Sequence, residues 1–306
     1  MVTPQMDMAT LAVDSQCLLG ESVLWCEQRE RLYWVDIEGA KLWQHDPASS
    51  LTQMWTLPDR PACLALGIDG RLLIGLAKGL YFADLNAAGN DAALAPTLIA
   101  QVEAGTGPDT RLNDGRADRH GNFVFGTKNE RGDRARIGRF YQYSVGHGLR
   151  TLDLPQAAIP NSICFDASGN TMYFCDSIDP RILRCRYDSR SASVSSIETF
   201  VELDHPEASP DGSIVDAEDH LWNAQWGAGR VVRYAPDGSV SRCVSVPVSQ
   251  PSCCALGGSG GSQLFVTSAS IDMKPSDLED MPAAGDLFVA NLRESLARPA
   301  DRVLLP

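Results

Sequence analysis

One pattern recurs along this chain and constrains its fold more than any other feature. An apolar strand is followed by a turn rich in Asp, Gly or Asn, and then by a second strand rich in Trp, Tyr, Phe, Val or Leu. The repeats start about 40 to 50 residues apart, which is the period of a four-stranded propeller blade. The best matches among the second strands are LYWVDI, LLIGLA, FVFGT, MYFCDS, LWNAQW and LFVTSAS.

This repeat predicts an all-β fold, a six-bladed β-propeller of four-stranded antiparallel blades. A four-stranded unit is too small to bury both of its faces alone, whereas blades stacked in a ring cover one another. We interpret the six matching strands as equivalent inner strands whose ends approach the central channel. The alternative is a β-sandwich or two barrels, whose strands would not recur in this order. No linker divides the chain, so residues 1–306 are expected to form a single domain, with one short helical turn in SDLEDMPAAG.

The net charge and the cysteines indicate which kinds of partner the protein is expected to bind and in which cell compartment it is expected to work. The chain has 39 acidic and 26 basic residues and a net charge of −13, whereas nucleic acids and anionic membranes are bound by clustered Lys and Arg. The stretch MVTPQMDMATLAVDSQ lacks the basic and apolar regions of a signal peptide, and no apolar run approaches the length of a membrane span. Nine cysteines without a CxxC spacing indicate reduced thiols, with a catalytic or zinc-binding cysteine as the alternative. We expect a cytoplasmic protein.

Oxygen-bearing side chains recur at the entries of four repeats. They are Glu21, Asn113 with Asp114, Asn161 and Asp211, each just ahead of an apolar or small-residue strand. In a propeller the loop ahead of each inner strand lies near the axis, so we expect these side chains to converge. Their oxygens suit one divalent cation: Ca²⁺, Mg²⁺ or Mn²⁺, and less typically Zn²⁺ or Fe²⁺. For any single Asn or Asp, the alternative is that it caps its own turn.

Other residue types that carry chemistry do not share these positions. The five histidines lie elsewhere, so a His-rich zinc site is not expected. Asp36 and Asp176 lie instead at the ends of two matching strands, and we interpret Asp36 as structural and Asp176 as either structural or a minor member of the site. The GxSxG match in the chain, GGSGG at residues 257–261, lies in a loop-like context rather than at a strand-to-helix turn, which argues against a serine esterase.

Taken together, these segments resemble the gluconolactonase family that includes senescence marker protein and regucalcin. The resemblance covers nearly the whole chain, through LGESVLW, RLNDGRAD, GNFVFGT, PNSICFDASGNTMYFCDS and PDGSIVDAEDHLWNAQWG. It implies a six-bladed propeller that hydrolyses a sugar lactone and holds one divalent cation through Glu21, Asn161 and Asp211. It also implies that Arg111 and Asn113, in the R-x-N-D motif, contact the substrate.

The chain departs from the family pattern at two positions and carries a basic stretch. Ser22 and Ser162 stand where the family usually has Gly after a metal ligand, so we expect a slightly different local geometry. After the GT strand, KNERGDRARIGR offers Glu130 as a further substrate contact. This stretch, residues 128–139, is either a lid that attracts an anionic sugar acid or a solvated loop, and we favour the solvated loop.

These residues support metal-dependent hydrolysis of an aldonolactone to the aldonic acid, in a cytoplasmic route of sugar oxidation. Hydrolysis of this cyclic ester builds negative charge on the carbonyl oxygen, which a divalent cation stabilises. Asp211 is the candidate catalytic proton acceptor, and Arg111 and Asn113 donate hydrogen bonds to the substrate.

The expected partner is a small sugar lactone, with a slight preference for a pentonolactone over gluconolactone that rests on overall resemblance. Two alternatives stay open: a metal-dependent esterase or phosphotriesterase, and a non-catalytic calcium-binding propeller. The sequence leaves the oligomeric state open.

Overall fold

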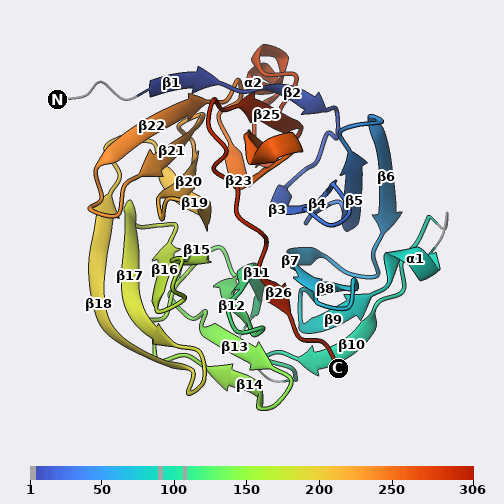
Figure 1. The fold of residues 1–306 in the computed structure, drawn as a ribbon, viewed down its shortest axis with the longest axis vertical. Coiled ribbons are helices and arrows are strands. Elements are labelled where there is room, and N and C mark those ends of the chain that lie inside the picture. The colour runs from blue at the N-terminus through green and yellow to red at the C-terminus, as the bar shows by residue number, and fades with distance from the viewer. Residues whose placement is uncertain (1–4, 89–91, 106–108) are drawn as a thin grey trace.

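The computed structural model describes residues 5–88, 92–105 and 109–306 of the chain. Within these ranges the strands form six sheets, four of them with four strands and two with five. Figure 1 shows the sheets arranged as the blades of a ring around a central axis. The predicted six-bladed β-propeller is therefore confirmed.

The first strand of each blade lines the central channel. Each of these strands contacts the first strands of both neighbouring blades, which closes the ring. Small residues and a local irregularity near the start of each strand let six strands approach one axis. The first strands are β3 (Gly20–Cys26), β7 (Pro61–Gly67), β11 (Thr110–Ala117), β15 (Pro160–Phe165), β19 (Ser209–Val215) and β23 (Pro251–Gly257).

The six matching segments of the sequence form the second strand of each blade, one position further from the axis. Their equivalence is confirmed, but their interpretation as innermost strands is wrong. Bulky side chains such as Trp34 and Trp222 are fully buried on these strands, where the layers between blades have room for them. The second strands are β4 (Arg31–Asp36), β8 (Leu72–Leu76), β12 (Phe123–Asn129), β16 (Thr171–Asp176), β20 (Leu221–Trp226) and β24 (Gln263–Ser268).

The third and fourth strands complete each blade toward the outside. The third strands are β5 (Lys41–Asp46), β9 (Gly79–Ala83), β13 (Phe140–Ser144), β17 (Arg181–Asp188), β21 (Arg230–Tyr234) and β25 (Leu287–Asn291). In five blades the fourth strand follows in the chain, as β6 (Leu51–Thr56), β10 (Thr97–Gln101), β14 (Gly148–Thr151), β18 (Ser193–Glu202) and β22 (Val240–Ser245).

Blade 6 takes its outer strand from the other end of the chain. β2 (Thr10–Val13) pairs antiparallel with β25, with Thr10 opposite Val289. Two short strands extend other sheets: β1 (Gln5–Met8) joins blade 5 beside β22, and β26 (Arg302–Val303) joins blade 2 beside β7. Figure 1 shows the C-terminal segment crossing the middle of the ring to reach β26.

Helical structure is confined to connections. The described helices are α1 (Leu85–Ala88), the 3₁₀ turn η1 (Ser259–Gly261) and α2 (Pro275–Asp280). The last of these confirms the predicted helical turn in SDLEDMPAAG. None of the described helices is both long and apolar enough to cross a membrane.

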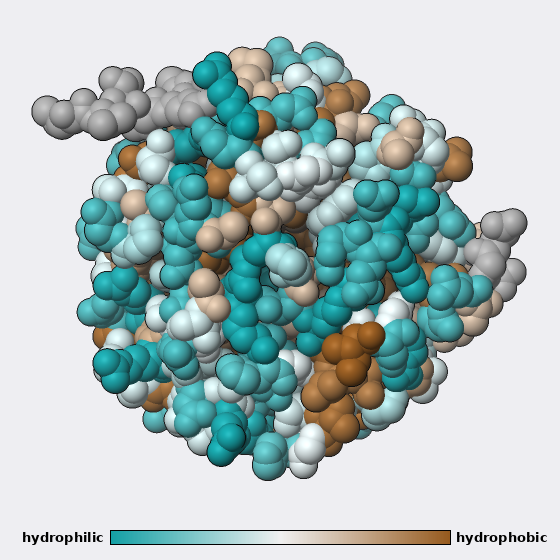
Figure 2. Space-filling view, viewed as in Figure 1, coloured by the Kyte–Doolittle hydropathy of each residue, from teal (hydrophilic) through white to brown (hydrophobic). Residues whose placement is uncertain are grey.

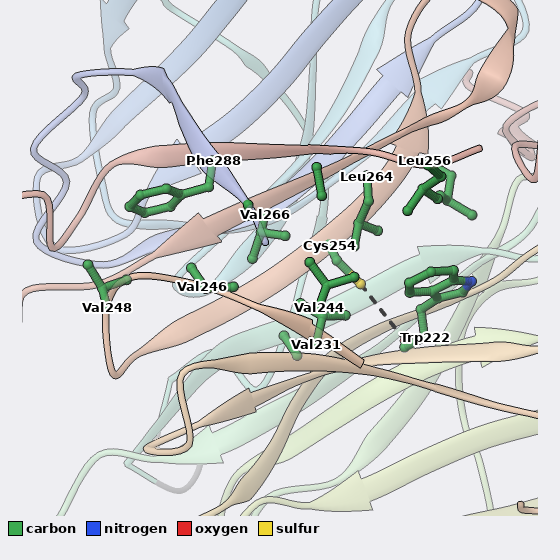
Figure 3. Close-up of a cluster of buried hydrophobic side chains, with 14 of the residues drawn as sticks. Trp222, Val231, Val244, Val246, Val248, Cys254, Leu256, Leu264, Val266 and Phe288 are labelled. Atoms are coloured by element: carbon green, nitrogen blue, oxygen red, sulfur yellow. Dashed lines mark hydrogen bonds between the residues drawn. The ribbon is translucent and has the colours of Figure 1, made fainter. Parts of the chain in front are cut away.

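Apolar side chains pack between neighbouring blades and hold the ring together. Figure 3 shows one such cluster, in which side chains of blade 5, such as Trp222 and Val244, pack against side chains of blade 6, such as Leu256 and Val266. The thiol of Cys254 donates a weak hydrogen bond to the carbonyl oxygen of Trp222 across the same boundary, at 3.9 Å. Hydrophilic residues cover most of the face seen in Figure 2, so the apolar layers lie inside the molecule.

Candidate active site

Each first strand in the described part of the chain has a β-bulge near its start. A bulge adds a residue to one strand, bends it and re-aims the side chains around it. The register shifts fall between Glu21 and Leu24, Pro61 and Cys63, Leu112 and Gly115, Asn161 and Cys164, Pro210 and Ser213, and Pro251 and Cys253. The polar residues predicted to precede inner strands therefore lie inside first strands. These strands begin before the polar residues and not, as predicted, after them, because a bulge makes an apolar strand pattern look as if it began later.

Hydrogen bonds and charges bring the predicted residues of separate blades together. The Nδ2 of Asn113 donates to the Oδ1 of Asn161 at 3.2 Å, which joins blades 3 and 4. The hydroxyl of Ser162 donates to the carbonyl oxygen of Asp211 at 2.7 Å, which joins blades 4 and 5. Burial raises the pKa of Asp211 well above its usual range, and the carboxyl of Glu21 in blade 1 raises it further. Four blades thus meet at one polar centre.

The carboxyl groups of this centre suit a cation. The Oδ1 of Asp211 is buried and has no hydrogen-bond partner among the described residues. Burial raises the pKa of Glu21 to about 8, and the nearby carboxyl of Asp114 contributes to the rise. Asp114 itself is occupied, because its two oxygens accept from the backbone N–H groups of Gly115 and Ile163 at 2.9 and 2.7 Å. Glu21 and Asp211 are left as adjacent buried acids that a positive charge would stabilise as carboxylates.

The third ligand in this set is an amide rather than a charged group. No three His, Cys, Asp or Glu side chains in the described ranges are arranged to hold a metal. A cation bound here would rely on Glu21, on Asp211 and on the amide oxygen of Asn161, with water or substrate at its other positions. The amide of Asn161 is oriented by its Nδ2, which donates to the hydroxyl of Ser177 at 2.9 Å.

Arg111 is buried beside this centre and organises the groups predicted to contact substrate. Only 2% of its side chain is exposed. Its NH1 donates to the Oδ1 of Asn113 at 3.1 Å, and its Nε lies 3.6 Å from a carboxylate oxygen of Glu130. Asn113 therefore links Arg111 to Asn161, since its oxygen and its nitrogen are both engaged. Arg60 holds Glu130 with two contacts of 2.9 Å. Burial opposes ionisation of Glu130, but the hydrogen bond from Arg60 and the charges of Arg60, Arg111 and Lys128 together outweigh it and lower the pKa of Glu130.

Lys128 belongs to the same group of residues, and the sequence analysis missed it. It was assigned to the basic stretch 128–139, but it lies on β12 directly opposite Arg111. Burial lowers the pKa of Lys128 to about 8, Arg111 lowers it further, and the charge of Asp211 opposes the shift. The ammonium group of Lys128 makes no hydrogen bond or ion pair with any described residue. A lysine within two residues of the end of an apolar strand is the signal that would have identified it.

The middle of the basic stretch is exposed, and Arg136 ties it to blade 4. Residues 131–136 are exposed to solvent. Arg136 forms ion pairs with Asp176 and Asp179 of blade 4, at 2.9 Å each. The favoured description as a solvated loop agrees with this exposure. Asp176 also accepts from the backbone N–H groups of Ala158 and Ile159, each at 2.9 Å, and so has a structural role.

Asp36 has the same structural role in blade 1, as predicted. It accepts from the backbone N–H groups of Leu18, Leu19 and Gly39 at 3.0 to 3.2 Å. These bonds fix the chain segment that enters the first strand of the blade.

The two serines that follow the proposed ligands adopt the conformation that usually calls for glycine. The φ angles of Ser22 and Ser162 are 52° and 58°, in the left-handed region. A residue with a Cβ costs about 1–2 kcal/mol there. In return, Ser22 accepts from the backbone N–H of Leu64 in blade 2 at 2.8 Å, and Ser162 bonds to Asp211 in blade 5. Each hydroxyl joins its blade to the next one, which a glycine cannot do.

The fold and this centre define a class: six-bladed β-propellers with a buried carboxylate–amide centre at one end of the channel. Comparison with known proteins is more specific. The sequence profile of the family described as "SMP-30/Gluconolactonase/LRE-like region" matches residues 19–270, and the chain belongs to this family.

Its relatives include two lactonases and a calcium-binding protein. L-arabinolactonase of Azospirillum brasilense is 46% identical over 291 residues, which are 94% of this chain and 93% of the relative. The pentonolactonase of Haloferax volcanii is 30% identical over 288 residues, 94% of either chain. The crystal structure of regucalcin from Agrobacterium tumefaciens, described as a calcium-binding protein, has a TM-score of 0.89 and 29% identity and covers both chains completely.

Proposed function

We propose that this chain hydrolyses the lactone of a five- or six-carbon sugar acid, with a pentonolactone as the preferred substrate. It is an ester hydrolase of the lactonase class. The observation that carries the proposal is the buried centre of Glu21, Asn161 and Asp211, with Arg111 and Lys128 beside it. The names of two relatives, an L-arabinolactonase and a pentonolactonase, support a five-carbon substrate.

We further propose that Glu21, Asn161 and Asp211 hold one divalent cation, with Ca²⁺, Zn²⁺, Mg²⁺, Mn²⁺ and Fe²⁺ as the candidates. The orphaned Oδ1 of Asp211 and the raised pKa values of both acids support this assignment. When bound, such a cation supplies Lewis-acid stabilisation of the charge that develops on the lactone carbonyl oxygen. The relative from Agrobacterium tumefaciens, described as calcium-binding, favours a metal of this kind.

The residues of the chain have separate tasks in this proposal. The carboxylate of Asp211 accepts the proton of the attacking water through the oxygen that does not hold the cation. Arg111 donates to substrate oxygens and keeps Asn113 oriented toward Asn161. Lys128 offers an ammonium group to the carbonyl oxygen, or to the carboxylate that forms when the ring opens. Glu130 is held by Arg60 and accepts from a substrate hydroxyl.

We also place the protein in the cytoplasm, in a route of sugar oxidation. All nine cysteines lie in the described part of the chain, none forms a disulfide, and eight of them are buried. Such thiols persist in a reducing compartment.

The test is acid release from arabinono-, xylono-, galactono- and gluconolactone, corrected for spontaneous ring opening, with and without a chelator. We expect the fastest turnover on a pentonolactone, and its loss with the chelator. If an aryl ester or a phosphotriester is hydrolysed and no sugar lactone is, the chain is an esterase or phosphotriesterase. Tight metal binding without turnover of any of these compounds would identify a non-catalytic calcium-binding propeller.

A further inference from the structure

The far part of the central channel holds a cavity that the proposed hydrolysis does not use. Its volume is about 110 Å³, and it is lined by later residues of the first strands, such as Phe165, Val215 and Leu256. Glu21 and the other residues of the polar centre lie near the start of these strands, so the cavity is about 10 Å further along the axis, at roughly 3.3 Å per residue. Residues 298–301 form one wall of the cavity, where the C-terminal segment crosses the ring in Figure 1.

One wall of the cavity carries a cation without a counter-ion. Arg298 makes no hydrogen bond or ion pair with any described residue, and its NH1 is buried. Burial lowers the pKa of Arg298, and no neighbouring charge opposes this shift. A buried guanidinium N–H without an acceptor is unfavourable, because it has lost its hydrogen bonds to water. The unpartnered guanidinium group of Arg298 therefore lies beside a cavity that could hold an acceptor.

Two further arginines line the cavity, and they differ in how well they are satisfied. Arg119 forms an ion pair with Asp301 and donates to the carbonyl oxygens of Phe165 and Asp166 at 2.8 and 2.9 Å. The NH2 of Arg116 donates to the carbonyl oxygen of Ser213 at 3.0 Å, but its Nε is buried without a partner. Two guanidinium groups, those of Arg116 and Arg298, therefore offer unused donors to the same cavity.

The other lining residues indicate what kind of anion fits. Apart from the arginines and Asp301, they are apolar or small, including Leu24, Leu66 and Ala255. An apolar cavity of about 150 Å³ is large enough to hold a benzene ring, so this volume suits an apolar body of a few carbon atoms. A guanidinium binds a carboxylate through paired hydrogen bonds. A sugar acid does not match such walls, because its hydroxyls would lose their partners.

We propose that the channel cavity behind residues 298–301 binds a small organic carboxylate with an apolar body, held by the guanidinium groups of Arg298 and Arg116. Arg298 lies apart from the lactone-hydrolysing centre, whereas the charge of Arg116 also acts on Asp114 and Glu21 of that centre. The proposal does not depend on the function proposed for that centre.

The experiment is calorimetric titration of the full chain with benzoate and butyrate, and with their neutral amides as charge controls. We expect both carboxylates to bind more tightly than their amides. Arg298→Leu should weaken benzoate binding by about 10-fold or more, the loss of one charge-assisted contact of about 1.5 kcal/mol or more. The matched control Arg293→Leu removes an exposed arginine from the same segment and should change the affinity less than about twofold.

Two more variants separate this site from the polar centre. Ala255→Leu fills the cavity and should weaken benzoate binding without removing a charge, whereas Asp211→Ala should leave it unchanged. The proposal is wrong if the carboxylates bind no better than their amides, or if Arg298→Leu binds benzoate as well as the wild-type chain does. It is also wrong if inorganic phosphate binds and neither carboxylate does, because the cavity then takes an inorganic anion. Arg298→Leu should fold normally, since Arg298 makes no bond to lose, and its melting temperature checks this.

Discussion

The β-bulges of blades 1, 3, 4 and 5 differ in chemistry from those of blades 2 and 6. The first group presents Glu21, Asn113, Asn161 and Asp211 to the polar centre. In blade 2 the bulge carries Ala62 and Cys63, and a Cβ on Gly75 or Gly115 would come within 2.6 or 3.1 Å of the Cys63 sulfur. In blade 6 it carries Ser252, whose hydroxyl donates to the carbonyl oxygen of Gly20 and lies 3.0 Å from the hydroxyl of Thr267.

This difference separates what the fold requires from what the reaction requires. All six described first strands have a bulge, so we interpret the bulge as a requirement of the fold, because it lets six strands approach one axis. Only four of the bulges carry oxygen atoms that point to the polar centre, while the other two fill the space between blades. Substitutions at the two groups of bulges should therefore have different consequences, for activity in the first group and for stability in the second.

The largest effect is expected from Asp211→Ala. It removes one of two ligand charges and the proposed proton acceptor, so activity should fall by at least about 1,000-fold. Metal content, measured on the purified protein, should fall as well. The matched control is Asp237→Ala in the same blade, whose side chain bonds, among the described residues, only to Ser239 in its own turn. Near-normal turnover of Asp211→Ala with metal still bound would refute the assignment of this bulge.

Arg111→Ala should come next, with kcat/KM lowered by about 10- to 1,000-fold, because one charge-assisted contact of about 1.5–3 kcal/mol is lost. Arginine has no lone pair for a cation, so the metal content should stay intact. Arg111→Lys keeps the charge but not the paired donors and should fall in between. Loss of metal from Arg111→Ala would show instead that Arg111 acts by holding the chain around Asn113.

Lys128→Met should lower kcat/KM by about 10-fold, because an ammonium group near the developing negative charge is removed. The metal content and the melting temperature should change little, since Lys128 has no hydrogen bond to lose among the described residues. Lys274→Met, at an exposed lysine, is the control. If Lys128→Met and the wild-type chain have equal kcat/KM on every lactone tested, Lys128 has no part in the reaction.

The smallest effect on activity is expected at a bulge of the second group. Cys63→Ala removes a fully buried thiol and should lower the free energy of unfolding by about 1 kcal/mol. The kcat/KM on the best lactone should stay within about twofold of the wild-type value. A large loss of activity at unchanged stability would show that the apolar bulges also take part in the chemistry, and the distinction between the two groups would no longer hold.

The fold could be predicted because each blade repeats the same local pattern, but two features had no local signal. Nothing in the pattern distinguishes the first strand of a blade from the second, since both are apolar. The pairing of Thr10 with Val289 joins residues almost a chain length apart, and no short stretch of sequence encodes it. The extent of the domain, residues 1–306, stays a prediction.

The sequence predicted those site residues that recur at equivalent places in several repeats, and it missed the residues that occur only once. Glu21, Asn161 and Asp211 stood out because the same kind of residue returned at equivalent places in several repeats, and their roles stay predictions. Lys128 has no counterpart in the other repeats, and the sequence analysis assigned it to the basic stretch 128–139. Arg60 lies far from the motifs in sequence, and only the folded chain shows it holding Glu130.

The strand that completes blade 6 sets the order in which the molecule can form. β2 is near the start of the chain, but its partner β25 ends at Asn291, so the ring cannot close until almost the whole chain has been synthesised. At about 5–20 residues per second, the early strand waits for some tens of seconds with an unpaired edge. Blades 1 to 5 have all four of their strands in sequence and can assemble during this time. Ring closure is therefore expected to be the last step of folding, and its rate is expected to depend on how quickly the two ends of the chain meet.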